Sequence, residues 1–476
     1  MHRPVLRITL LTAAFALAAC VENAPVTPVA STATRIAAPS LQVASAASSF
    51  ELIPGQYLVM FKGNGIPASF AGDVAARGGS IQSSNDKVGV AVISGISAEA
   101  ATALSGRTDV QTFEQDALLY LDPSEVEVEA VPDEVASPAS PTGASRYARQ
   151  WNMRAIHADA AWAAGRLGSS SVTLAILDTG IDYLWPDLNG RVDLSRSTSF
   201  IPSDDAVTAA LFPGRHVVTD LHFHGTHVAS TAVSNSNIVA GVTTGTTLIG
   251  VKVCSRLGSC PSSAVLNGIL WATDHGADVI NMSLGGGFNK RIAGGFGSII
   301  NRVANYANRN GTLIVVSAGN EAFDMDHDGD LYKTYCSAPN VVCVSATGPT
   351  ASSGVNGPWV NVDAPTNYTN FGRSQISVAA PGGSGAGAVW AGCSQTTTMA
   401  SLAVCKTGIF ILGATGTSMS SPHVSGLAAS IKAAFGGSPA QLRAALQQSA
   451  DDLGEPGNDP FYGKGRINAA RALGIN

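Results

Sequence analysis

Apolar segments that fit buried strands recur along the last two thirds of the chain, and stretches that fit helices alternate with them. The segments are SVTLAILDTG, TTLIGVKVC, ADVINMSLGG, GTLIVVSAGN and VVCVSATG. A strand such as LIVVS is apolar on both faces, which is typical of a parallel sheet that helices cover on both sides. The pattern predicts an α/β fold over residues 149–476: a doubly wound, mostly parallel sheet with helices on both faces.

Polar residues stand where several of these segments end. Asp178 follows LAIL, and Asn320 closes VVSAGN. His224 opens HGTHVAS, and Ser418 lies in GTSMSSP, each at the expected start of a helix. Ligands of doubly wound sheets bind at the carboxyl ends of the strands, so these residues are candidates for a site. Together they supply a nucleophile, a base, a carboxylate that orients the base and a donor for an oxyanion, the groups that catalysis by serine needs.

The motifs around these residues resemble those of the subtilisin-like serine peptidases. LAILDTGID, HGTHVAS, VINMSLGG, SAGN and GTSMSSPHVSG stand in the family's order, over about residues 150–473. The resemblance implies that Asp178 orients His224, which acts first as general base and then as general acid. It implies that Ser418 attacks the substrate. The developing oxyanion would then receive hydrogen bonds from the Asn320 side chain and from the Ser418 N–H at a helix N-terminus.

Neighbouring residues offer alternatives to two members of this set. Ser420 and Ser421 lie close to Ser418, but serine and a following proline suit the first turn of a helix, so we expect both to be structural. Asp182 lies four residues after Asp178 and is an alternative orienting acid. The family motif places the functional acid directly after the strand, which favours Asp178.

The spacing of three histidines suggests a metal site as a further alternative. His222, His224 and His227 form a His-x-His-x2-His pattern that is rich in potential ligands. No carboxylate motif stands beside it. We therefore favour His224 as the catalytic base and expect His227 to be a buried structural histidine.

The segment NMSLGG carries no chemistry of its own. In the family this strand edge pairs with the substrate backbone, and glycine permits the close approach. The resemblance therefore makes Ser283, Leu284 and Gly285 substrate-binding candidates, with simple sheet packing as the alternative. Residues 257–260, LGSC, resemble the opposite wall of the substrate cleft, where a cysteine pair departs from the family pattern.

Two segments are candidates for structural calcium. Residues 324–330, DMDHDGD, have the order of a calcium loop in which alternate oxygens face one ion. Position twelve is Tyr335 rather than Glu, which excludes an EF-hand and leaves a smaller loop site or a solvated acidic turn. The family resemblance adds a second site at a shortened loop. The candidate ligands are Asp187, Asn237, Asp324, Asp326 and Asp328, and no cofactor is expected for catalysis.

The first twenty residues have the features of an export signal. Arg3 and Arg7 precede an apolar run too short to span a bilayer, and small residues follow it. LAAC, which ends at Cys20, resembles the box at which bacterial lipoproteins are lipidated and cut; an ordinary signal peptide that ends near a cysteine is the alternative. Residues 21–49 are rich in Ala, Pro, Ser and Thr and predict a tether. We expect a lipoprotein precursor in the cell envelope, bound to the membrane only through this anchor, and a released mature enzyme.

The six remaining cysteines fall into three near pairs. They are Cys254 with Cys260, Cys336 with Cys343, and Cys393 with Cys405. An even number in an exported chain indicates disulfides, and the absence of Cys-x2-Cys spacing disfavours zinc. Spacing does not fix the connectivity, but short local loops are the simplest pairing.

Residues 50–122 predict a small α+β domain. YLVMFK, VGVAVISGI and VQTFEQDALLYL fit strands, and SFAGDVAARGG and SAEAATALSGR fit helices, the second begun by Ser97. The first and last strands resemble those of the family's inhibitory pro-segment, which implies a ferredoxin-like pro-domain; an unrelated α+β module is the alternative. As in relatives, ALLYL would then lie along the cleft, with the cut close to Leu121 and Asp122 and with Leu118 as a second apolar anchor. Residues 123–148 predict an acidic, proline-rich linker.

Composition narrows the function classes. The 476 residues are 45% hydrophobic and 13% charged, so the chain can bury a large core. A net charge of −6 without a Lys/Arg run excludes a nucleic-acid footprint. An esterase would favour Gly-x-Ser-x-Gly, whereas Ser418 stands in Gly-Thr-Ser-Met-Ser. We expect an exported, monomeric serine endopeptidase that cuts protein or peptide substrates through an acyl-enzyme on Ser418. It would be made as an autoprocessed precursor inhibited by its own pro-domain; a catalytically silent binding module of the same fold is the alternative.

Overall fold

The computed structural model describes residues 34–36, 51–121, 126–132, 137–290, 294–327, 329–333 and 335–475. Within these ranges no helix is long and apolar enough to cross a membrane. The predicted signal peptide with Cys20 lies outside the described residues, as do Asp122 and Asp328.

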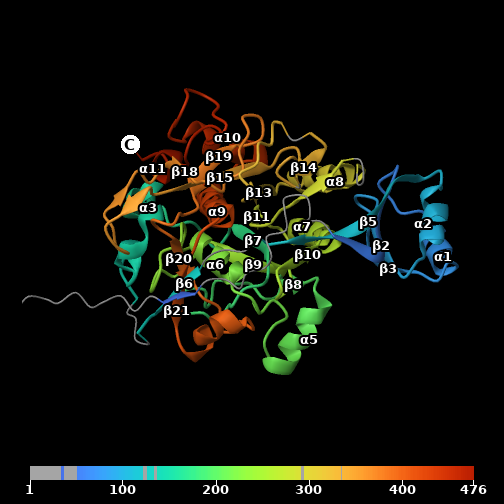
Figure 1. Cartoon of the computed structure of the whole chain (residues 1–476), viewed down its shortest axis with the longest axis horizontal. Helices are drawn as coiled ribbons and strands as arrows, with labels where there is room; N and C mark the ends of the chain where they lie inside the picture. Colours follow the sequence, from blue (N-terminus) through green and yellow to red (C-terminus); the bar gives the residue numbers. More distant parts are fainter. Residues whose placement is uncertain are drawn as a thin grey trace, which may run out of the picture. The chain divides into compact units, whose positions relative to one another are not determined.

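A mostly parallel sheet forms the centre of the large domain, as predicted (Figure 1). Its strand order is β18-β15-β13-β11-β7-β9-β8, and β19 pairs with β15. The strands are β7 (Thr173–Asp178), β8 (Thr198–Ser199), β9 (Thr247–Lys252), β11 (Val279–Met282), β13 (Leu313–Ser317), β15 (Val342–Gly348), β18 (Ala364–Pro365) and β19 (Val378–Pro381). Only the pairing of β18 with β15 is antiparallel among these described strands.

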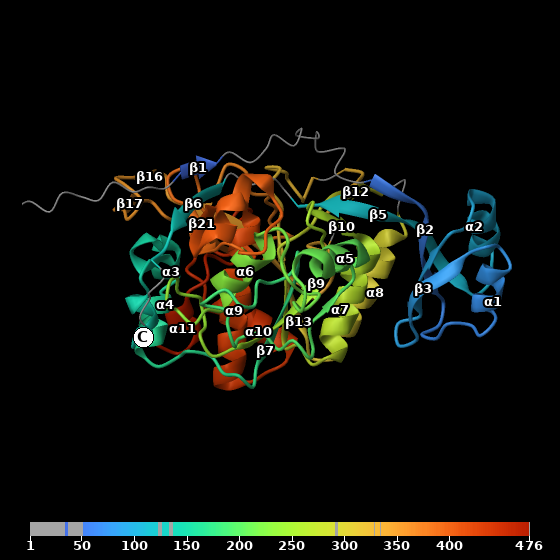
Figure 2. The same ribbon diagram turned by 90° about the horizontal axis from the view of Figure 1, so that it is seen from below.

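Helices cover both faces of this sheet (Figure 2). They are α6 (His224–Ala232), α7 (Ser262–Asp274), α8 (Phe296–Arg309), α9 (Thr417–Phe435) and α10 (Pro439–Gln448). Alternate residues of β7 belong to different cores: Ala175 and Leu177 pack with α7 and α8, whereas Leu174 and Ile176 pack with α6, α9 and α10. Because β7, β11 and β13 are buried at every position, their sequences are mostly apolar.

Shorter elements of the large domain surround the sheet. They are α3 (Trp151–Ala155), α4 (Ala158–Ala163), α5 (Pro202–Leu211), α11 (Ala469–Ala472), β10 (Ser259–Pro261), β12 (Gly287–Asn289), β14 (Leu331–Lys333), β16 (Ala351–Ser352), β17 (Trp359–Val360), β20 (Val389–Gly392) and β21 (Phe410–Ala414), with 3-10 turns η1 (Pro141–Gly143), η2 (Tyr147–Arg149) and η3 (Ala400–Thr407). The cysteines pair locally, as the simplest pairing predicted: Cys254–Cys260, Cys336–Cys343 and Cys393–Cys405 are disulfides.

The small domain, residues 51–121, has a ferredoxin-like βαββαβ order. Its elements are β2 (Glu51–Phe61), α1 (Phe70–Ala75), β3 (Ser80–Asn85), β4 (Val90–Ser94), α2 (Ala98–Ser105) and β5 (Val110–Tyr120). The antiparallel strand order is β5-β2-β4-β3. The Ser97 side chain caps α2 by accepting the Ala100 N–H. The sequence analysis missed β3, because SIQSSN is an edge strand with a single apolar residue.

The sheet of the small domain continues into the large domain (Figure 2). Strand β5 pairs antiparallel with β10, with Leu119 opposite Cys260 and Tyr120 opposite Ser259. Leu121 extends the pairing by donating its N–H to the Gly258 carbonyl at 2.8 Å. The end of β5 is therefore bound as an added strand at the edge of the large domain.

The predicted linker 123–148 is corrected by the structure. Strand β6 (Val126–Ala130) pairs with β21, and β1 (Thr34–Ile36), within the predicted tether, pairs with β6. Glu129 of β6 is buried in ion pairs with Arg146 and Arg149. Acidic composition indicated solvent exposure, but these arginines neutralise Glu129 and the valines of VEVEA are buried. The large domain thus begins at β6 rather than at Arg149.

Candidate active site

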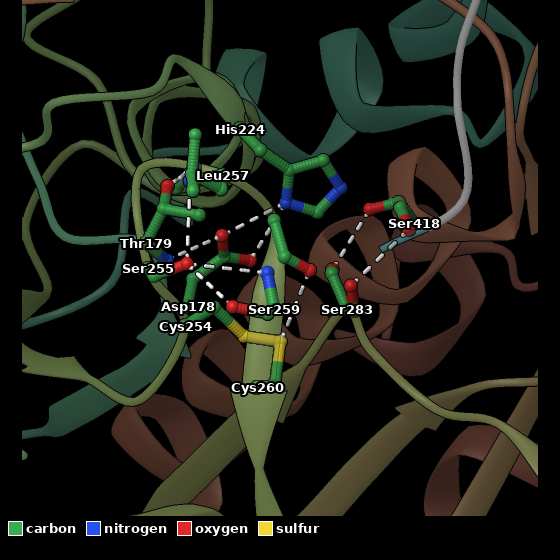
Figure 3. Close-up of a disulfide and its surroundings, with 12 residues drawn as sticks. Asp178, Thr179, His224, Cys254, Ser255, Leu257, Ser259, Cys260, Ser283 and Ser418 are labelled. Carbon is green, nitrogen blue, oxygen red and sulfur yellow. Dashed lines mark hydrogen bonds and ion pairs between the residues drawn. A yellow bond between two sulfur atoms is a disulfide. The ribbon is translucent and has the colours of Figure 1, made fainter. Parts of the chain in front are cut away.

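Asp178 and His224 form a hydrogen-bonded pair at one edge of the central sheet. Asp178 is the last residue of β7 and is fully buried, and His224 is the first residue of α6. The imidazole Nδ1 lies 2.8 Å from Asp178 Oδ1 and 3.0 Å from Oδ2. Because a carboxylate only accepts, Nδ1 carries the proton and Nε2 is the basic atom. Figure 3 shows the other side of the imidazole facing Ser418.

Ser418 lies in the first turn of α9, two residues after a glycine with unusual backbone geometry. Gly416 has a φ of 148°, in the region that favours glycine. Ser418 Oγ donates to the Ser283 carbonyl at 3.2 Å, and Ser283 Oγ donates to the Ser418 carbonyl at 2.8 Å. N–H groups of a first helical turn have no acceptor within the helix, and they suit an anion. Ser418 is partly exposed, as a nucleophile requires.

Asn320 is oriented by the residue that precedes Ser418. Its Oδ1 accepts the Thr417 N–H at 2.8 Å and the Thr417 hydroxyl at 2.9 Å. These bonds fix the side-chain amide and make Nδ2 its donor. The structure thus brings Asn320 and the start of α9 together, as the sequence analysis expected for an oxyanion hole.

The alternatives to these residues have other roles in the structure. Asp182 accepts hydrogen bonds from Arg215 and from the Gln395 N–H. His227 Nε2 lies 3.0 Å from the Val389 carbonyl and 3.1 Å from that of Leu412, at a fully buried position. Burial lowers the pKa of His227 to about 3, so the ring is neutral. Among the described residues no three His, Cys, Asp or Glu side chains gather around a possible metal site.

Ser283, Leu284 and Gly285 follow β11 and lie beside β5 of the small domain. Ser283 and Leu284 are buried, and Gly285 is partly exposed. The next residue, Gly286, lies close to the small domain: a Cβ built on it would lie 2.9 Å from Leu119 Cδ2. The sequence analysis did not select Gly286, although the second glycine of NMSLGG was the available signal.

The apolar residue of β5 that packs against the large domain lies one position after the expected one. Leu119 is 1% exposed, whereas Leu118 is half-buried and Tyr120 is 38% exposed. Side chains alternate along a strand, so a shift of one residue places the other face against the enzyme. Leu119 and Leu121 therefore face the large domain, and the expectation for Leu118 was wrong.

Two carboxylates of the small domain bind the starts of two helices. Asp116 accepts the Ser263 N–H in the first turn of α7 at 3.1 Å, and Glu114 accepts the Gly295 N–H at the start of α8 at 2.8 Å. Negative charge at a helix N-terminus is stabilising. Burial raises the pKa of both carboxyl groups. The sequence analysis missed these two residues, which lie in FEQD.

Backbone N–H groups surround the carboxylate of Asp187, a candidate calcium ligand. One Asp187 oxygen accepts the Asn237 N–H at 2.7 Å, and the other accepts the N–H groups of Ile238 and Val239 at 3.0 and 2.9 Å. Oδ2 therefore accepts two donors and Oδ1 accepts one, while the side-chain oxygen of Asn237, the other candidate ligand, is buried without a hydrogen-bond partner among the described residues. The shortened loop thus supplies backbone N–H groups to the carboxylate.

Asp324 and Asp326 turn to different partners. Asp324 accepts from His327 Nδ1 and from the Asp326 N–H. Asp326 accepts the N–H and the hydroxyl of Ser374. The two carboxylates do not converge on one point, and Asp328 lies outside the described residues.

Sequence reasoning also missed Asp220, four residues before His224. Asp220 is fully buried, and burial raises its pKa to about 6. It accepts the His222 N–H at 2.9 Å. An acidic residue shortly before HGTH was the available signal.

The comparisons with known proteins match this geometry. Residues 169–465 match the model of the subtilase family of peptidases. The chain belongs to the subtilase family. Thermitase from Thermoactinomyces vulgaris is 31% identical over 68% of this chain and 96% of its own length. Subtilisin E from Bacillus subtilis is 33% identical over 69% of this chain and 73% of its own.

Solved structures share the fold of this subtilase. The epidermin leader peptide processing serine protease from Staphylococcus aureus superimposes with a TM-score of 0.67 at 20% identity, over 89% of this chain and 98% of that one. Fervidolysin from Fervidobacterium pennivorans gives a TM-score of 0.63 at 22% identity, over 93% of this chain and 63% of that one. The family and the curated relatives support a peptidase function.

Proposed function

We propose that the protein is an exported serine endopeptidase whose nucleophile is Ser418. The observation that carries the proposal is the 2.8 Å contact between His224 Nδ1 and Asp178, with Ser418 at the other side of the imidazole (Figure 3). Asp178 holds the tautomer in which Nε2 is basic and stabilises the imidazolium that forms during the reaction. Peptidase relatives support the same assignment.

The reaction follows from the positions of these groups. Ser418 Oγ attacks the carbonyl carbon of the scissile peptide bond while His224 Nε2 takes the hydroxyl proton. The oxyanion receives hydrogen bonds from the Ser418 N–H and from Asn320 Nδ2. His224 returns the proton to the leaving amine, so the carbon–nitrogen bond breaks and an acyl-enzyme remains. Water, deprotonated by His224, then hydrolyses the ester and regenerates Ser418.

The small domain supports the further proposal of an inhibited precursor. Strand β5 occupies the edge of β10 with Leu119 against Gly286, which is how an extended substrate would bind. Arg302 of α8 strengthens the attachment by donating to the carbonyl oxygens of Phe61 and Val88. We infer that the small domain blocks the site until the chain is cut close to Leu121, and that Cys20 anchors the precursor.

Replacing Ser418 by alanine tests the proposal. Purified Ser418→Ala protein should remain a folded, full-length precursor that does not cleave casein or react with an organophosphonate label. Ser353→Ala changes an exposed serine and should mature, cleave casein and take up one label, as the wild type should. Cleavage of casein by pure Ser418→Ala protein would refute the assignment. A wild type that stays unlabelled after the small domain is removed would favour the silent binding module.

A further inference from the structure

Strand β6 is attached to the large domain by its own contacts. Glu129 is ion-paired with Arg149 and, at 3.0 Å, with Arg146. The Arg149 guanidinium lies over the ring of Trp390 on β20, 5.4 Å from its centre. Breaking a buried ion pair leaves an uncompensated charge, so departure of β6 would be costly. None of these partners belongs to the small domain.

Apolar contacts tie β6 to the segments that carry the catalytic residues. Val126 and Val128 are 4% exposed and belong to one buried cluster with Phe223 and Met419. Phe223 precedes His224, and Met419 follows Ser418. Five residue pairs, from Val126 opposite Ala414 to Ala130 opposite Phe410, join β6 to β21. Removing β6 would therefore expose both valines and the edge of β21.

Strand β6 lies near the place where substrate residues after the scissile bond, the leaving-group side, would extend. Strand β21 ends at Ala414, four positions before Ser418, and β6 lies along its edge. Strand β5 lies on the acyl side, along β10, and ends with the bond from Leu121 to Gly258. Four residues, 122–125, connect Leu121 to Val126 in the sequence. A substrate that pairs with β10 as β5 does would extend its leaving-group side toward the edge of β21.

We propose that β6 stays paired with β21 after the small domain is removed and closes the leaving-group side to long extended chains. This proposal rests on the proposed peptidase function. The mature enzyme would begin just before β6, and fewer than four substrate residues beyond the scissile bond would fit before they meet Val126. Its preferred substrates would be polypeptides with few residues after the scissile bond, and long extended chains would be cut more slowly.

Peptide length tests the proposal directly. Fluorogenic peptides would share Ala-Leu-Leu-Tyr-Leu before the scissile bond and carry one, three or six residues after it. With the mature wild type, kcat/KM should rise up to three leaving-group residues and fall at least fivefold from three to six. An equal or higher kcat/KM for the six-residue form would overturn the proposal. The mature wild type and all folded variants should cleave a chromogenic arylamide, which has no leaving-group residues. Failure on this substrate would instead count against the peptidase function.

Two variants assign the effect to β6. Glu129→Gln keeps the side-chain size but removes the charge that Arg146 and Arg149 bind. It should bring the ratio of kcat/KM for the six-residue form to kcat/KM for the three-residue form close to one. Glu455→Gln removes an exposed ion pair with Arg373 and should leave the wild-type ratio unchanged. A general loss of stability would lower the rates for all lengths alike. If folded Glu129→Gln protein, with normal arylamide activity, kept the wild-type ratio, β6 would not be the cause.

Hydrogen exchange gives a readout that does not depend on the variants. Amides of residues 126–130 in the mature wild type should exchange at least tenfold more slowly than in the unfolded chain, because β21 pairs with them. N-terminal sequencing should find a mature start at or before Val126. Fast exchange of this segment, or a mature start beyond Ala130, would overturn the proposal.

Discussion

Thr179 Oγ1 donates a hydrogen bond of 2.9 Å to the carboxylate of Asp220 and so joins the two segments that carry Asp178 and His224. Thr179 Oγ1 also accepts the N–H of Gly225, the residue after the histidine, at 3.0 Å. The other Asp220 oxygen accepts the N–H and the hydroxyl of Thr226 in the first turn of α6. Asp220 therefore fixes the backbone beside both members of the catalytic pair.

Asp220→Asn should lower kcat about 10-fold to 100-fold with little change in KM, because small displacements of catalytic groups reduce the rate without weakening substrate binding. Steady-state kinetics on an arylamide would check this. If Asp220→Asn only reduced the amount of folded enzyme, active-site titration would show an unchanged kcat per active molecule, and the positioning role would be wrong.

The same variant should change how stability depends on pH. Burial raises the pKa of Asp220 from the ordinary value of about 3.9 to about 6, so between these values the folded protein holds a proton that the unfolded chain releases. This contribution to stability is complete below pH 4 and is lost as the pH rises to about 6, by about 3 kcal/mol at most. Thermal unfolding of the wild type and Asp220→Asn should therefore differ in pH dependence over this window. Parallel curves of Tm against pH for the two proteins would contradict the raised pKa of Asp220.

The meeting of Asp178 with His224 could be predicted from sequence, because each ends or begins an element whose apolar pattern is local. The parallel sheet could be predicted for the same reason, since β13 is buried at each position and apolar at all but Ser317. The apolar patterns are local, whereas the pairing of Asp178 with His224 followed from the family motifs, because the two residues lie far apart in the chain.

Features that depend on distant partners could not be predicted in this way. The acidic segment 126–130 became a strand because Arg146 and Arg149 neutralise Glu129, and composition does not show such pairing. The choice of Leu119 over Leu118 depends on the register of β5 against β10. Likewise, the sequence does not show that the shortened loop turns three backbone N–H groups toward the Asp187 carboxylate.

Gly286 lies against Leu119, whose place an apolar substrate side chain would take in the proposed scheme. The Gly286→Ala variant places a methyl group 2.9 Å from the position of Leu119 Cδ2. It should reduce the preference for Ala-Leu-Tyr-Leu over Ala-Ala-Tyr-Leu arylamide about 10-fold, the range for one or two methylene groups in an apolar pocket. Gly287→Ala is the matched control, because its Cβ would meet Lys333 only at an ordinary 3.7 Å. Equal preferences in the two variants would show that Gly286 does not contact substrate.

The Cys254–Cys260 disulfide links the segment beside Asp178 to β10, the strand that pairs with β5 (Figure 3). The Cys254 N–H donates to the Asp178 carbonyl at 3.2 Å, and Cys260 lies opposite Leu119. Replacing both cysteines by serine should raise KM for a five-residue arylamide several-fold and leave KM for a one-residue ester nearly unchanged. The Cys336 and Cys343 double variant should lose similar stability, about 2 kcal/mol for so short a loop, without this length dependence. Similar kinetics for the two double variants would contradict a role in substrate pairing.

The order of Cys20, β5 and the active site along the chain makes maturation a release step in the proposed scheme. A cut close to Leu121 separates the lipid site, which precedes the small domain, from Asp178, His224 and Ser418. An acyl anchor holds only the chain to which it is attached, so the large domain would keep no lipid of its own. In fractionated cells, Ser418→Ala precursor should stay with the membrane while the wild-type large domain becomes soluble. A Cys20→Ala precursor that also carries Ser418→Ala should be soluble without being cut. Mature wild-type enzyme that remains membrane-bound after salt and carbonate washing would show that the cut or the anchor lies elsewhere.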